Sequence, residues 1–130
     1  MISRRVVLAG MAAAALPTYG SAFAAEEQPF TPELFQAAQD QHKSILIEIY
    51  ASWCPTCRAQ KPILSDLLAK PKFKDLTVLR VDFDSQKNDV RNLRANVQST
   101  LIVFKGREEV GRSVGQTKPD ALAALLDKAI

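Results

Sequence analysis

The hydrophobic pattern of this chain alternates between short apolar runs and helical spacings. Residues 45–51 form an apolar, β-branched run interrupted only by Glu48, which predicts a central strand covered on both faces. Three further runs end at polar residues or glycine and predict strands over residues 76–83, 100–104 and 109–113. The pattern therefore predicts four strands in one sheet.

Helical spacings separate these runs. Thr31-Pro32-Glu33 is typical of a helix start, with a hydroxyl N-cap followed by proline, and this helix is expected to end near Gln41. A second helix follows residues 52–57 and ends near Lys70-Pro71. A short polar helix is expected over residues 86–94, and a last helix begins at residues 117–120. The predicted order is α-β-α-β-α-β-β-α, which is an α/β domain.

Residues 1–24 predict a removable export signal. A basic start at Arg4-Arg5 precedes a weakly apolar run over residues 6–16, and Ala22-Phe23-Ala24 is an A-x-A cleavage motif. The run is too short to span a bilayer, which takes about 20 helical residues. We expect cleavage before Ala25, a domain over residues 25–130 and a periplasmic location. The basic start resembles a twin-arginine signal, and both export routes stay open.

Charge gives little indication of partners. The chain carries 17 Lys and Arg against 14 Asp and Glu, and two of the basic residues lie in the predicted signal. The remainder is close to neutral and has no basic cluster interleaved with aromatic residues. We therefore expect no nucleic-acid partner.

The candidate chemistry lies in Cys54 and Cys57, the only two cysteines of the chain. A bridge between residues this close constrains the unfolded chain very little, so it is a poor structural staple. A structural pair and half of a zinc site remain alternatives. Zinc takes four ligands, and a single remote His42 leaves no mononuclear metal site, although a site shared between two chains stays open. The pair is best interpreted as a redox couple.

The residues around this pair carry a resemblance to a known family. The run 45–62 contains Trp53-Cys54-Pro55-Thr56-Cys57, with Pro62 five residues after the second cysteine. With residues 81–84 and 100–106, this stretch resembles the thioredoxin superfamily across the whole mature domain. The resemblance implies a thioredoxin fold with a central mixed β-sheet flanked by helices. It also implies a thiol–disulfide oxidoreductase with no cofactor beyond a reversible Cys54–Cys57 disulfide.

Each residue of the couple has an expected role. Cys54, at the start of a helix, is the candidate nucleophile, because the helix N-terminus favours its thiolate. Cys57, one turn further on, would resolve the mixed disulfide. The resemblance implies that Glu48 accepts the proton of Cys57, with a pKa raised by burial, and that Arg80 is its partner.

Neighbouring residues are expected to tune the site. Trp53 is expected to shield the dithiol and contact the substrate, with plain core packing as the alternative. Pro55 and Thr56 lie between the cysteines and tune the redox potential. The Cys-Pro-x-Cys form resembles glutaredoxins and periplasmic oxidases, which hints at a potential above about −270 mV.

One departure from the family concerns Ser99 and Thr100. The family has a cis-proline before the threonine that opens the third strand, and here Ser99 occupies that position. A non-proline cis bond costs about 2.5–4 kcal/mol, so a trans peptide or a rearranged loop is expected. Substrate contacts at this loop are expected to change accordingly.

These observations lead to two functional hypotheses. The first is a periplasmic thiol–disulfide oxidoreductase, more a reductase or electron relay than a dedicated oxidase, because no helical insertion follows the cysteines. Its substrates would be protein or small thiol and disulfide compounds, with a membrane-bound redox partner. The alternative is a binding module or metallochaperone that holds Cu(I) through the dithiol. The sequence leaves the oligomeric state open.

Overall fold

The computed structural model describes residues 13–15 and 25–130. The predicted apolar run and the Ala22–Ala24 motif lie mostly or wholly outside these residues. The elements in chain order are β1 (Glu27–Pro29), α1 (Pro32–Asp40), β2 (Ser44–Tyr50), α2 (Pro55–Leu68), the 3-10 turn η1 (Pro71–Phe73), β3 (Thr77–Asp82), α3 (Lys87–Asn92), β4 (Thr100–Lys105), β5 (Glu108–Val114) and α4 (Pro119–Asp127).

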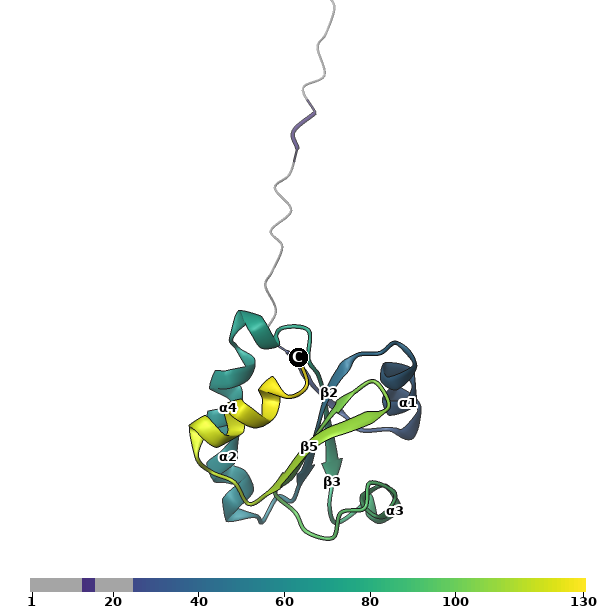
Figure 1. Ribbon diagram of the computed structural model, residues 1–130, viewed down its shortest axis with the longest axis vertical. Coiled ribbons are helices and arrows are strands. Elements are labelled where there is room, and N and C mark those ends of the chain that lie inside the picture. Colours follow the sequence, from purple (N-terminus) through teal and green to yellow (C-terminus); the bar gives the residue numbers. More distant parts are fainter. Residues whose placement is uncertain (1–12, 16–24) are drawn as a thin grey trace, which may run out of the picture.

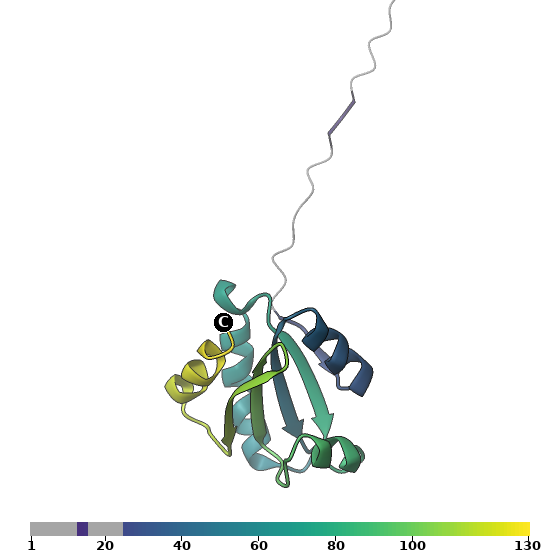
Figure 2. The ribbon, with the colours of Figure 1, turned by 45° about the vertical axis from the view of Figure 1, so that its right-hand side comes forward.

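The strands form one mixed sheet in the order β1-β3-β2-β4-β5. Strands β1, β2 and β3 run parallel, whereas β4 pairs antiparallel with β2 and with β5. Helices α2 and α4 lie on one side of this sheet, and α1 and α3 lie on the other (Figures 1 and 2). The predicted thioredoxin fold with a mixed sheet between helices is confirmed.

Each face of the sheet buries its own apolar core. Alternate residues along a strand point to opposite faces, so Leu46 of β2 packs toward α2 and α4 while Ile45 and Ile47 pack toward α1 and α3. All three side chains are fully buried. The central position of β2 explains its continuous apolar run, because a strand covered on both faces has no solvated side.

The first strand was absent from the sequence prediction. No element is predicted before Thr31, but Glu27–Pro29 pairs in parallel with β3. All three residues of β1 are exposed, so no apolar alternation marks them. Pro29 is tolerated because β1 is an edge strand that needs hydrogen bonds on one side only.

The fold places the two cysteines where β2 ends and α2 begins. Cys54 is the N-cap of α2 with an extended backbone (φ −81°, ψ 111°), and Pro55 takes the first helical position. Proline fits there because the N–H that it lacks has no partner in the first turn. Among the described residues, no helix has the length and apolar character needed to cross a membrane.

Candidate active site

Cys54 and Cys57 are joined by a capping interaction. The Cys57 backbone N–H donates to the Cys54 sulfur, with a distance of 3.0 Å between N and Sγ. Both cysteines are free thiols in the structure. A sulfur at a helix N-terminus that receives an N–H bond is well placed to carry negative charge, because both effects stabilise an anion. The geometry therefore suits Cys54 as the attacking sulfur.

Cys57 lies in a less favourable setting for a thiolate. Burial raises the pKa of the Cys57 thiol to about 11, and its contact with Cys54 adds to the rise, while backbone groups of Ala51 and Ser99 oppose it. Desolvation penalises the charged form of a thiol, so Cys57 keeps its proton at neutral pH. A base is therefore needed when Cys57 reacts.

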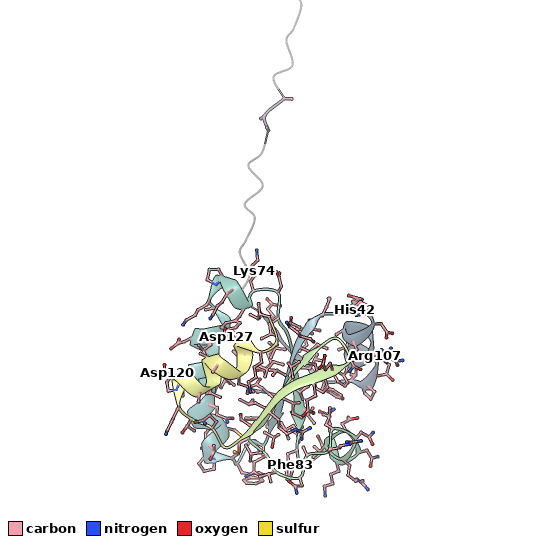
Figure 3. All side chains as sticks on the ribbon, in the orientation of Figure 1. His42, Lys74, Phe83, Arg107, Asp120 and Asp127 are labelled. Carbon is pink, nitrogen blue, oxygen red and sulfur yellow. The ribbon has the colours of Figure 1, made fainter. Side chains whose placement is uncertain are left out.

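Residues between a strand and a helix are usually exposed, but these two cysteines are not: Cys54 is 0% exposed and Cys57 is 5% exposed. Cys54 turns its sulfur over the first turn of α2 and packs with Ala51, Tyr50 and Phe83. In Figure 3, Phe83 marks this end of the domain, opposite the end that carries His42. Attack on a disulfide therefore requires a local opening of the Cys54 side chain.

Trp53 does not belong to the core. Its side chain is 52% exposed, which excludes the alternative of plain core packing. The indole Nε1 donates to Asp84 Oδ2 at 2.8 Å, and this links the start of α2 to the loop after β3. The tryptophan thus presents an open, fixed aromatic face next to the cysteines. Pro55 is likewise exposed and Thr56 is half-buried.

The loop before β4 takes an unusual backbone path at Ser99. No peptide bond of the described residues is cis, and Ser99 has a left-handed backbone with φ +57°. Its N–H donates to the Ile49 carbonyl at 2.8 Å, and its carbonyl accepts the Gly115 N–H at 3.0 Å. Proline has no N–H and holds φ near −65°, so the observed path fits serine and excludes proline.

Hydroxyl groups close this loop on itself. Ser99 Oγ donates to the Gln98 carbonyl at 2.6 Å, and Thr100 Oγ1 donates to the Val97 carbonyl at 2.7 Å. Ser99 and Thr100 are both buried, at 5% and 2% exposure. These carbonyl groups already have partners, so an extended peptide finds fewer free acceptors at this edge.

Gln60 is a site residue that sequence reasoning missed. It is 3% exposed, and its Nε2 donates to the Gln116 carbonyl at 2.9 Å and to the Ser99 carbonyl at 3.4 Å. The side chain therefore ties α2 to two loops, one before β4 and one before α4. Its position three residues after Cys57 on the buried face of α2 was a possible signal, but its partners lie far away in the sequence.

The strained backbone of Ser99 gives a stability prediction. We expect Ser99→Gly to be more stable than Ser99→Ala by about 1 kcal/mol, because a left-handed backbone costs about this much for a residue with a Cβ atom. Both variants lose the same hydroxyl, so their difference isolates the backbone term. Urea unfolding followed by circular dichroism measures it. Equal midpoints for the two variants would contradict the strain.

Glu48 lies on the α2 face of the sheet, behind the cysteines. It is 8% exposed, and burial, together with Glu27, raises the pKa of Glu48 to about 8 against the opposing positive charges of Arg80 and Lys61. Arg80 Nε is 3.9 Å from Glu48 Oε2. In the described part of the chain no hydrogen bond joins Glu48 to Cys57, so a proton passing between them needs a water molecule or a shift of side chains.

The described residues contain no group of three or more His, Cys, Asp and Glu side chains that could hold a metal ion. The dithiol offers two sulfur atoms, and zinc takes four ligands. The arrangement of a capping sulfur, a second thiol one turn later and a buried acid is suited to disulfide exchange.

Comparisons with known proteins agree with this geometry. The Thioredoxin family pattern matches residues 26–128. The chain is 37% identical over 84 residues to a thioredoxin of Chlamydia trachomatis, covering 65% of this chain and 80% of that protein. It is 33% identical over 88 residues to Thioredoxin H2-1 of Oryza sativa, covering 68% of this chain and 62% of that protein.

A solved structure matches as well. The crystal structure of Trxlp from Edwardsiella tarda superposes with a TM-score of 0.76 and 40% sequence identity, covering 78% of this chain and 98% of that one. The fold, the position of Cys54 and Cys57 and these matches agree. The chain belongs to the thioredoxin family of thiol–disulfide oxidoreductases, which work through a reversible cysteine disulfide.

Proposed function

We propose that this protein is an exported reductase or electron relay that reduces disulfides through Cys54 and Cys57. The observation that carries the proposal is the capped Cys54 sulfur beside a Cys57 thiol that holds its proton. Cys54 attacks a substrate disulfide and forms a mixed disulfide. Cys57 then loses its proton to the ionised fraction of Glu48 and attacks Cys54. The substrate sulfur leaves as a thiolate that takes a proton from solvent, and the Cys54–Cys57 disulfide remains.

The state of the dithiol supports the proposed direction of electron flow. A dithiol couple is strongly oxidising when its reduced form is stabilised, and a stable thiolate provides this stabilisation. Burial acts against a thiolate at Cys57, which favours a reducing couple. In addition, α2 leads through η1 directly into β3, without an inserted helical domain. Pro55 and the capped sulfur of Cys54, which favours a thiolate, point the other way.

Exposed apolar side chains support protein disulfides as substrates. Trp53 is half exposed, and Val97 and Val114 are also exposed large apolar residues. Apolar contact area near a reactive sulfur suits a protein chain, although the closed Ser99 loop leaves small disulfides as competing substrates. We place the protein in the periplasm on the strength of its N-terminal pattern, with a membrane-bound partner that exchanges electrons with the couple.

Equilibration of the couple in glutathione buffers tests the direction of electron flow. We expect a potential near that of thioredoxins, about −270 mV. A value of about −120 mV, which is typical of a strongly oxidising dithiol oxidase, would overturn the reductase assignment. Cell fractionation followed by N-terminal sequencing tests location: a mature chain that begins at Ala25 in the periplasm is expected, and an uncleaved cytoplasmic chain would exclude export.

A titration of the same protein with Cu(I) distinguishes the alternative function, a Cu(I)-binding module, from the proposed reductase. A metal thiolate requires both sulfurs to be deprotonated, and the raised pKa of Cys57 opposes this. We therefore expect weak Cu(I) binding and rapid reduction of insulin by the dithiol form. Stoichiometric, Cys57-dependent Cu(I) binding without insulin reduction would favour the module instead.

A further inference from the structure

An acidic pair with one arginine lies beneath α2. The parallel register places Glu48 of β2 opposite Arg80 of β3, and Glu27 of β1 enters from the sheet edge on the same face. Arg80 Nε is 2.7 Å from Glu27 Oε1 but 3.9 Å from Glu48 Oε2. The arginine is also stacked on the Tyr50 ring, with its guanidinium carbon 4.1 Å from the ring centre. The arginine is therefore held against Glu27 rather than Glu48.

One oxygen of the inner carboxyl group lacks a donor. Glu48 Oε2 is buried and has no hydrogen-bond partner in the described part of the chain. Arg80 Nε forms an ion pair with Glu27 at 2.7 Å but makes no aligned hydrogen bond there. A charged oxygen in that position is unfavourable, because burial without a partner costs its solvation. A proton on the pair removes this cost, since a protonated carboxyl group can bond to a neighbouring carboxylate.

A pocket connects this pair to solvent. It has a volume of about 180 Å³ and is lined by Glu27, Glu48, Lys61 and Ser65, with an apolar wall from α2. Glu27 stands at its rim with its side chain 36% exposed, whereas the Glu48 side chain is 11% exposed. Protons can therefore reach the inner carboxyl group past the outer one.

We propose that Glu27 is a positioning residue of the redox site, and that its carboxylate keeps one proton on the Glu27–Glu48 pair at neutral pH. The proposal rests on the proposed function, in which Glu48 exchanges a proton with Cys57. Both carboxyl groups line the same pocket, and the negative charge of Glu27 disfavours the ionised form of Glu48. In agreement, burial and Glu27 together raise the pKa of Glu48 to about 8.

The proton held by the Glu27–Glu48 pair is used when the Cys54–Cys57 disulfide is reduced to the dithiol. A dithiol reductant attacks Cys54, the S–S bond breaks, and its electron pair leaves on Cys57 as a thiolate. The carboxyl pair gives its proton to that sulfur and is reprotonated from solvent through the pocket. The second thiol of the reductant then displaces Cys54, so the reductant becomes a disulfide and the couple a dithiol. Glu27 thus favours the reduction of the Cys54–Cys57 disulfide back to the dithiol.

Three of the elements packed against Glu48 place a charged side chain near it, and β4 does not. Glu27 comes from β1, Arg80 from β3 and Lys61 from α2, whereas β4 places the uncharged Leu101 opposite Glu48. Arg80 and Lys61 both oppose the retention of a proton. Glu27 is the group that favours it, which makes its removal the informative change.

Carbon-13 NMR titration of the glutamate carboxyl groups tests the proposal on the full chain. We expect Glu27→Gln to lower the midpoint of the Glu48 signal by about one pH unit, because the second carboxylate is gone and Arg80 is free to pair. Glu26→Gln is the matched control: it removes the same charge one residue away, on an exposed side chain that lines a different pocket. It is expected to leave the midpoint unchanged. Glu27→Asp, which keeps the charge, is expected to stay near the unmodified protein.

Kinetics provide the second readout. The rate at which dithiothreitol reduces the Cys54–Cys57 disulfide is measured against pH and corrected for the thiolate fraction of dithiothreitol. In Glu27→Gln this rate is expected to lose its inflection near pH 8. An unchanged Glu48 midpoint in Glu27→Gln, or an equal shift in Glu26→Gln, would overturn the proposal. Should Glu27→Gln fail to fold, the unmodified protein decides: a Glu48 midpoint that stays near 4.5, the ordinary value, would overturn the proposal. Loss of Cys54-dependent exchange would instead refute the proposed function.

Discussion

Replacement of Cys54 by serine is expected to abolish insulin reduction, with a loss of at least about a thousandfold. A serine hydroxyl is a weak nucleophile at neutral pH, and among residues 13–15 and 25–130 no base forms a hydrogen bond with the side chain at this position. The Cys57 N–H would still cap the helix through the hydroxyl oxygen, so the fold should be kept. The insulin turbidity assay measures the loss, and circular dichroism checks the fold.

Cys57→Ser is the matched control for this prediction. It removes the second sulfur while leaving the attacking one, so we expect a stable mixed disulfide with substrate in place of turnover. Mass spectrometry of the trapped adduct identifies the attacking residue. Turnover that survives in Cys54→Ser, or an adduct that forms on Cys57, would reverse the assigned roles of the two cysteines.

Most of the fold was predictable because its strands are marked by apolar runs. Residues 45–51 were expected for β2, and the strand covers Ser44–Tyr50. Residues 100–104 were expected for β4, and the strand covers Thr100–Lys105. Strand β1 could not be found in this way, because its residues are polar and exposed and only its pairing with β3 makes it a strand.

The site was predictable where chemistry is local in sequence. Cys54, Pro55 and Cys57 lie within one turn, so their geometry follows from the helix start alone. Gln60 and Glu27 escaped detection because each acts through a residue more than 20 positions away. The burial of Cys54 also escaped, since it depends on how its side chain folds over the helix N-terminus.

Glu48→Gln is expected to stabilise the protein at pH 8 by a few kcal/mol. Burial raises the pKa of Glu48 from 4.5 to about 8, so the folded protein holds a proton that the unfolded chain has released. The stability contributed by this proton is fully present below about pH 4.5 and is lost as the pH rises through 8. At 1.36 kcal/mol for each pKa unit, the loss is on the order of 3 to 5 kcal/mol.

Urea unfolding at pH 5 and at pH 8 measures this effect. The unmodified protein should lose stability over this range, whereas Glu48→Gln, which has no proton to release, should change little. Glu108→Gln removes an exposed acid on β5 and should keep the pH dependence of the unmodified protein. A flat stability profile in the unmodified protein would show that Glu48 ionises freely. In that case Glu48 would hold no proton at neutral pH for the thiolate of Cys57, and the link between burial and proton transfer at this site would fail.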